Sequence, residues 1–368
     1  MIKFILSFFG GPVWIMDIEN LYSYVTFRAL LALIVSIIFM LLTGHRFILW
    51  LNRIKMKDTS GDFISIPVGS KRGTPTAGGI LIILATLISS LLLNDLNSRM
   101  VHLMIAATLF FGFIGYLDDL NKVRKKSSIK GLSQRQKTMA LLLFIVPFSF
   151  FITGSLSPVP AEFRTQLFVP FYKYPILDLG WTGFSLFLSL AIYSIVNSIN
   201  ITDGQDGALS GLSVLVTGVY CIFAFIISNY KLSGHYYFPF IPGTAEIVVF
   251  GAAMIGAVIG FLWFNTYPAE VFMGDTGSLA IGGNIALMAV MTKQEVLFLI
   301  IGGVFTFEIL TSLLQEKVGN QIGQRIFTRA PYHHSLTHKG IAEPKAVMRL
   351  LLVGIILAAI GLLSVKIR

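Results

Sequence analysis

The chain has 368 residues, of which 55% are hydrophobic and only 12% charged, and its mean hydropathy is +0.79. This composition excludes an ordinary soluble domain and leaves room for about ten membrane spans of ~20 residues each. The net charge of +10 need not indicate nucleic acid, because basic loops also orient a membrane protein and attract anionic substrates. The single cysteine, Cys221, excludes an intrachain disulfide.

Uninterrupted apolar runs predict an all-α polytopic membrane protein with one integral catalytic domain over residues 1–368. Ten spans place both termini on the same side of the membrane. The spans are expected near residues 23–50, 77–96, 100–117, 138–155, 177–197, 208–228, 245–264, 276–292, 295–315 and 346–365.

The loops between these spans divide the basic residues unequally. One side carries 19 Lys and Arg (six from Arg46 to Arg72, seven from Lys122 to Lys137, six from Lys317 to Arg349), and the other carries nine. Excess positive charge marks the cytoplasmic side, so both termini are expected outside. The Pro-rich outer loop at 156–176 contains a β-prone stretch and predicts a small hairpin.

Asp118 and Asp119 close the third span, and their adjacent positions give them different helix faces. Lys122 lies four residues after Asp118, which predicts an ion pair if the helix continues. A solvated helix end is the alternative. Two acids flush against a membrane favour a functional site instead.

Two further acidic loops reach the same side. The loop with Asn200, Asp203 and Asp206 predicts a turn that ends in an aspartate cap for the next span, or oxygen ligands for Mg²⁺ or a ribose and base. Asp275 enters the eighth span, either as a cap or as a metal ligand beside free N–H groups that accept phosphate. The glycine-rich segment at 69–79 suggests a second such helix start.

Three of the six histidines, His333, His334 and His338, fall in a basic loop between the last two spans. Zinc is disfavoured there because no cysteine is near and the neighbours are cationic, whereas imidazoles with positive charge suit oxyanions. Glu308, deep in the ninth span, is a functional candidate without an identifiable partner. The whole inventory favours phosphoryl transfer, which needs charge neutralisation more than a nucleophile.

The motifs resemble the polyprenyl-phosphate N-acetylhexosamine-1-phosphate transferase superfamily. They are Asp118-Asp119-x-x-Lys122, Asn200-x-x-Asp203-Gly204-x-Asp206, Asn265 through Phe272-Met273-Gly274-Asp275-Thr276-Gly277-Ser278, and Ala330-Pro331-Tyr332-His333-His334. Gly73-Thr74-Pro75-Thr76 and the paired histidines are similar, more narrowly, to the phospho-N-acetylmuramoyl-pentapeptide-transferases, translocase I of peptidoglycan synthesis. The match runs from about residue 70 to residue 340.

The resemblance implies a Mg²⁺-dependent enzyme of the bacterial cytoplasmic (inner) membrane, usually a homodimer, with its site in cytoplasmic loops. It would join UDP-MurNAc-pentapeptide and undecaprenyl phosphate into lipid I and UMP. By position, Asp275 resembles the Mg²⁺ ligand, Asp118 the acid that deprotonates the lipid phosphate, with Asp119 beside it, and Phe272 the uracil-stacking ring. Other implied site positions are Lys71, Thr76, Lys122, Asn200, Asp203, Asp206, Asn265 and Gly274 for substrate and His333 and His334 for catalysis.

One departure is that Ser335 stands where the family has a third consecutive histidine, while His338 follows three residues later. A sister enzyme that uses UDP-N-acetylglucosamine is therefore an alternative. A proton-coupled transporter is a second, but it would place its acids within the membrane, where only Glu308 lies.

Overall fold

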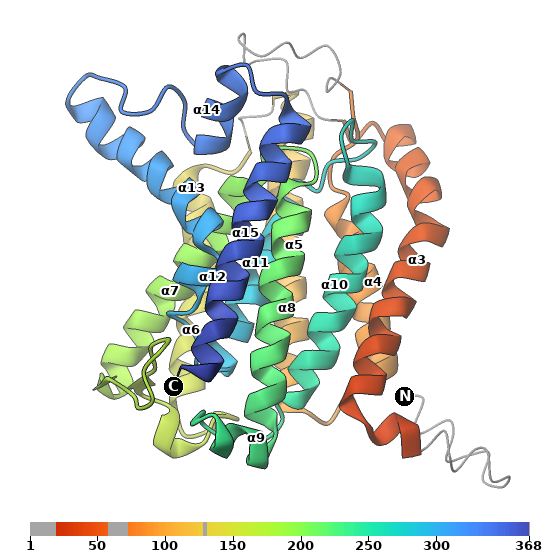
Figure 1. Ribbon diagram of the computed structural model, residues 1–368. Coiled ribbons are helices and arrows are strands. Elements are labelled where there is room, and N and C mark those ends of the chain that lie inside the picture. The colour runs from red at the N-terminus through yellow and green to blue at the C-terminus, as the bar shows by residue number, and fades with distance from the viewer. Residues whose placement is uncertain (1–19, 58–72, 128–130, 368) are drawn as a thin grey trace, which may run out of the picture.

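A computed structural model describes residues 20–57, 73–127 and 131–367, which form a bundle of helices (Figure 1). The helices are α3 (Val25–Arg53), α4 (Gly79–Leu93), α5 (Arg99–Arg124), α6 (Gln134–Thr153), α7 (Gly180–Thr202), α8 (Ala208–Ser228), α9 (Tyr230–His235), α10 (Ala245–Asn265), α11 (Gly274–Met291), α12 (Phe298–Ile301), α13 (Gly303–Leu313), α14 (Tyr332–His338) and α15 (Glu343–Lys366). A π-helical turn, η2 (Leu314–Gly319), extends α13.

The prediction of an all-α polytopic membrane protein is confirmed. Within the described ranges, seven helices are long and apolar enough to cross a membrane: α3, α5, α6, α7, α8, α10 and α15. The other predicted spans coincide with helices of a different kind. α4 has only 15 residues, α11 is buried along nearly its whole length, and the ninth span breaks at Gly302 into α12 and α13.

Close helix packing sets the position of α11 at the centre of the bundle, against α4, α5 and α7. A Cβ atom added to Gly79 of α4 would overlap the backbone of Gly277, and one added to Gly115 of α5 would overlap the backbone of Asp275. Small residues allow helix axes to approach this closely in a membrane. The N-terminus of α11 is thereby held directly against α5, where the paired aspartates lie.

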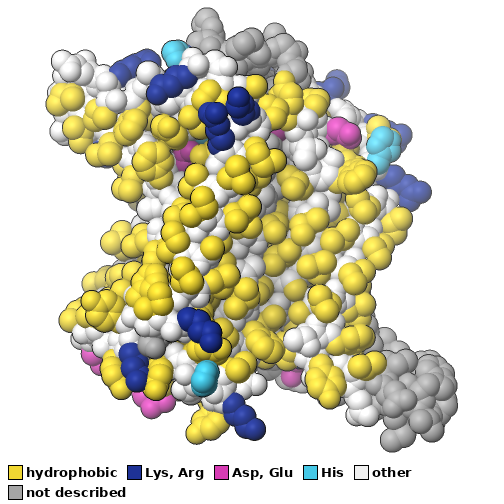
Figure 2. Space-filling model, in the orientation of Figure 1, with side chains coloured by type: hydrophobic (Ala, Val, Ile, Leu, Met, Phe, Trp, Pro, Cys, Tyr) yellow, Lys and Arg dark blue, Asp and Glu magenta, His cyan; other side chains and the backbone are white. Residues whose placement is uncertain are grey.

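The two ends of the bundle differ. Hydrophobic side chains cover its flank, and basic side chains gather at the end where α14 lies (Figure 2). The described residues start just before α3 and stop just after α15, both near the opposite end (Figure 1). The chain termini themselves, predicted to lie on the side away from the acidic loops, fall outside the described residues.

The predicted hairpin exists, although its strands lie elsewhere than expected. β1 (Gln166–Leu167) pairs antiparallel with β2 (Leu177–Asp178), so the strands flank the β-prone stretch. Pro170 and Pro175 lie between them and have no N–H to donate to a ladder, which keeps that stretch in the loop.

We expect Gly79→Val to destabilise the protein by at least about 2 kcal/mol, because a branched side chain forces α4 and α11 apart. Thermal unfolding in detergent measures the loss. Gly218→Val in α8 is the control, because an added Cβ there meets nothing within 4 Å. Equal melting temperatures for the two variants would contradict this packing.

Candidate active site

Three carboxylates from two helices meet at one end of the bundle. Asp118 and Asp119 lie near the end of α5, and Asp275 lies in the first turn of α11. One oxygen from each lies within 4.8 Å of the others, and the two α5 aspartates are almost fully buried. Carboxylates this close repel one another unless cations compensate their charge.

Two lysines supply that compensation. Lys122 Nζ lies 2.7 Å from Asp118 Oδ2 and 3.2 Å from Asp275 Oδ1, while Lys137 Nζ lies 2.6 Å from Asp275 Oδ2. The predicted ion pair between Asp118 and Lys122 is confirmed, because α5 continues to Arg124. Asn200 of α7 completes the cluster, accepting from Lys137 at 2.8 Å and donating to Asp275 at 3.2 Å.

The two adjacent aspartates face different partners, as the helix geometry predicts. Asp119 accepts the N–H groups of Asp275 and Thr276, each at 3.0 Å, and the Thr276 hydroxyl at 2.6 Å. Asp118 accepts from the backbone N–H of Leu132 at 2.6 Å. Asp119 therefore caps α11 from a neighbouring helix, whereas Asp118 faces the lysine and the loop before α6.

Backbone N–H groups that were expected to be free for phosphate at two helix starts have acceptors within the protein. Asp119 takes those at the start of α11. At the start of α4, the N–H groups of Gly78 and Gly79 donate to the carbonyls of Phe272 and Met273, both at 2.9 Å. Protein acceptors thus occupy these donors and join the 75–79 segment to the 272–273 segment.

The predicted aspartate cap on α8 is also wrong. Gly207 occupies the cap position with φ of 77°, a left-handed backbone that suits glycine. The Asp206 carboxylate instead accepts from the Ala269 N–H at 3.1 Å. Asn265 accepts from the Gly207 N–H and the Ser210 hydroxyl, both at 3.1 Å. Asp206 and Asn265 thus tie the loop after α7 to the loop before α11.

The remaining predicted residues surround this cluster at different depths. Gly274 has a φ of 72°, and a Cβ atom added to it would lie only 3.0 Å from the buried Thr76 hydroxyl oxygen. The absence of a side chain at this position keeps that space open. Phe272 is half-buried and donates its N–H to Pro75 at 2.8 Å. Lys71 falls outside the described residues.

Asp203 lies half-buried at the end of α7. Burial, together with the nearby charges of Asp275 and Asp119, raises the pKa of Asp203 to about 8. At neutral pH this carboxyl holds a proton, so it can donate a hydrogen bond as well as accept one.

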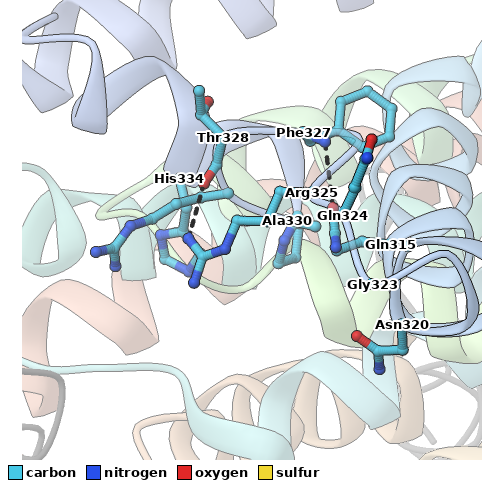
Figure 3. A pocket seen from close by; sticks show the side chains of 12 residues that line it. Gln315, Asn320, Gly323, Gln324, Arg325, Phe327, Thr328, Ala330 and His334 are labelled. Atoms are coloured by element: carbon cyan, nitrogen blue, oxygen red, sulfur yellow. Dashed lines mark hydrogen bonds between the residues drawn. The ribbon is translucent and has the colours of Figure 1, made fainter.

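The two adjacent histidines do not share one environment. His333 is 1% exposed and packs against Gly204, whereas His334 lines an open pocket of about 960 Å³. In Figure 3 this pocket lies between η2, with Gln315, and the segment that carries Arg325 and His334. Ser335, in place of a third histidine, binds the Arg329 backbone and the Thr328 hydroxyl and closes the loop before α14.

Comparison with known proteins now adds to this geometry. Residues 101–293 match the family described as Glycosyl transferase family 4. Relatives named Phospho-N-acetylmuramoyl-pentapeptide-transferase from Geobacter sp. (strain M21) and Citrifermentans bemidjiense are each 38% identical over 355 residues, and one from Maridesulfovibrio salexigens is 39% identical over 356 residues. Each alignment covers 95% of this chain and 96% of the relative.

The chain belongs to glycosyl transferase family 4. The resemblance inferred from the motifs is thereby confirmed. The matched span also includes all residues of the carboxylate–lysine cluster, which consists of Asp118, Asp119, Lys122, Lys137 and Asp275. His333 and His334 lie beyond residues 101–293, but they fall within the 95% of the chain that aligns with the three relatives.

Sequence reasoning did not assign Lys137 of this transferase, although it makes the shortest contact to Asp275. One signal was available. The capping residues Ser133 and Gln136 mark the start of a helix, which places Lys137 in its first turn. A cation is electrostatically unfavourable at a helix N-terminus, so its presence there indicates an acid nearby. Ser278, which accepts from Asn200 at 2.8 Å, carried no comparable signal.

The acidic cluster suits a hard divalent cation. Asp118, Asp119 and Asp275 offer oxygen atoms of the type that Mg²⁺ prefers, from positions close enough to share an ion. Asp119 accepts two backbone N–H groups and a hydroxyl from α11, whereas the Asp275 carboxylate is held by the side chains of Lys122, Lys137 and Asn200, which can move aside for a metal ion.

The raised pKa of Asp203 makes stability depend on pH. The folded protein keeps this proton up to about pH 8, whereas the unfolded chain loses it near the ordinary value of 3.8. The folded state binds more protons between these values, so the free energy of unfolding falls as pH rises through that window. We expect Asp203→Asn to melt above the wild type at pH 8 in EDTA, with a difference that shrinks toward pH 5.

Melting curves across pH 5 to 8 provide the measurement for Asp203. Glu162→Gln is the control, because Glu162 is exposed and far from the cluster. A constant difference between Asp203→Asn and wild type at all pH values would show that Asp203 does not titrate in this range.

Proposed function

We propose that this protein transfers phospho-N-acetylmuramoyl-pentapeptide from its UDP carrier to undecaprenyl phosphate, forming lipid I and UMP. The observation that carries the proposal is the cluster in which Lys122 and Lys137 flank Asp275 beside Asp118. Cations next to paired acids suit a reaction that moves a phosphoryl group between two anions. The three relatives, which are 38% to 39% identical over 95% of this chain, bear the name of that transferase.

In this mechanism Asp118 accepts the proton of the lipid phosphate. An oxygen of that phosphate then attacks the β-phosphorus of the nucleotide sugar, and the bond to the UMP oxygen breaks. Lys122 and Lys137 neutralise the charge that the diphosphate brings to the cluster. A route in two steps through an aspartyl phosphate uses the same residues.

We assign Mg²⁺ to Asp275, with Asp118 and Asp119 nearby. The ion would add positive charge where the diphosphate binds. We further propose that Thr76, Asn200, Asp203, Phe272 and Gly274 contact substrate, together with Lys71 outside the described residues. Asp206 and Asn265 act on substrate through the loops that they join.

The proposed setting is a bacterial inner membrane, with the cluster on the cytoplasmic face. The seven apolar helices support a multi-pass membrane protein, and the excess of 19 basic residues over nine that the sequence count assigns to the side of the acidic loops supports that orientation. A homodimer is part of the same proposal and rests on the family resemblance.

Two alternatives predict different behaviour. A sister enzyme would use the same cluster with UDP-N-acetylglucosamine. The replacement of a histidine by Ser335 slightly favours it, whereas the Thr74-Pro75-Thr76 segment and the paired histidines argue against it. A proton-coupled transporter would need acids along the membrane interior. Among the described residues, the cluster acids gather at one end instead, and Glu308 contacts His333.

The direct test incubates the purified protein with undecaprenyl phosphate, Mg²⁺ and either UDP-MurNAc-pentapeptide or UDP-N-acetylglucosamine. We expect UMP release from the muramyl substrate, abolished by EDTA and reduced about 1,000-fold by Asp275→Asn. UMP release only from the N-acetylglucosamine substrate would overturn the substrate assignment. Release that persists undiminished in EDTA would overturn the role of the metal.

Lys137→Met should lower kcat by about 100-fold, because it removes one of the two cations beside Asp275. Arg135→Met in the same helical turn is the matched control, since Arg135 is exposed. Steady-state UMP release from both variants gives the comparison. Equal rates would show that Lys137 serves stability alone.

A further inference from the structure

Glu308 of α13 is an acid outside the carboxylate–lysine cluster, and it is 0% exposed. The mechanism above does not use it. A buried carboxylate needs hydrogen-bond donors or a cation, because an unpaired charge in an apolar interior is strongly destabilising. Its partners therefore indicate what the residue does.

Both carboxylate oxygens of Glu308 contact one residue. The backbone N–H of His333 donates to Oε1 at 3.1 Å and to Oε2 at 3.2 Å. The imidazole Nδ1 of His333 also lies 3.2 Å from Oε2, although it is not aligned for a hydrogen bond. Glu308 thus holds the start of α14 by its backbone and its first imidazole together.

The opposite side of the His333 ring meets the loop that carries Asp203. A Cβ atom added to Gly204 would lie 3.0 Å from His333 Cε1 and would overlap Nε2. The Gln205 side chain donates to the His333 carbonyl at 3.2 Å. The ring is therefore clamped between α13 and the residues that directly follow Asp203.

His333 also sets the place of its neighbour. The rings of His333 and His334 lie with centroids 4.2 Å apart, and His334 lines the open pocket beside η2 (Figure 3). A movement of His333 would thus shift the loop at Gly204, next to Asp203, on one side and His334 on the other.

We infer that Glu308 is a positioning residue for the active site, which acts through His333 to fix the Asp203 loop and His334. The inference rests on the proposed function, since it concerns the same reaction. Glu308 touches no reacting atom in this scheme. Through His333, Glu308 joins α13 to the loop that carries Asp203 and to the start of α14. This matters for the rate, because a misplacement of catalytic groups by about 1 Å can lower it about 100-fold.

The test compares Glu308→Leu with Glu308→Gln, which retains a carbonyl acceptor for the His333 N–H. We expect kcat for UMP release to fall about 100-fold in Glu308→Leu and about tenfold in Glu308→Gln, with KM for the nucleotide changed less than kcat. Adding Glu308→Leu to His333→Leu should lower kcat no further, because both changes break one linkage.

Glu295→Gln is the matched control. Glu295 is also a buried acid, at 3% exposure, but it lines a separate cavity between α7 and α13. We expect its kcat per folded molecule to stay within about twofold of wild type. A purely structural need for buried acids would instead lower both variants alike, and that result would overturn the inference.

A second readout does not depend on activity. Modification by diethyl pyrocarbonate, located by mass spectrometry, should leave His333 unmodified in wild type and Glu295→Gln and modify it in Glu308→Leu. The exposed His338 serves as the internal reference. If wild type releases no UMP from either nucleotide sugar, the proposed function fails and this footprint alone decides the position of His333.

Continued protection of His333 in Glu308→Leu would overturn the inference, whatever the activity. Full kcat in Glu308→Leu, with an active wild type, would overturn it as well. Loss of protection together with the graded loss of kcat would support it.

Discussion

The compensation of the Asp275 charge is the interaction on which the site depends. Its carboxylate is held by Lys122 from α5 and Lys137 from α6, and Asn200 from α7 bonds the same group. Three consecutive helices, α5, α6 and α7, therefore converge on the first turn of α11, which lies far from them in sequence. Because burial without these partners would be unfavourable, the contacts that stabilise the fold also place two cations beside three acids, the arrangement on which the proposed phosphoryl transfer rests.

A second constraint is steric and serves the same end. Gly79 and Gly115 let α11 approach α4 and α5 so closely that Asp119 can cap it. Two N–H groups of this helix start are thereby paired with Asp119, and the Asp275 side chain lies beside Asp118. In the proposed function, anion binding therefore falls to the lysine side chains rather than to these backbone donors.

The general design could be predicted from the sequence, because membrane spans and loop charge are local properties. The gathering of acids at one end and the Asp118–Lys122 pair follow from span counting and helix spacing. Contacts between distant segments could not be predicted. Asp119 resembles any helix-end acid until α11 is placed beside it, and Glu308 has no visible partner until α14 folds back onto α13. Breaks and short helices, as at Gly302, also escape a hydropathy count.

The most direct test of the central claim is a structure of the protein with UMP and Mn²⁺, in which anomalous scattering locates the metal. The account predicts a single Mn²⁺ at the Asp275 carboxylate, with Lys122 and Lys137 within reach of the nucleotide phosphate. Metal and nucleotide bound elsewhere, with the pairs of Asp275 to both lysines unchanged, would contradict it.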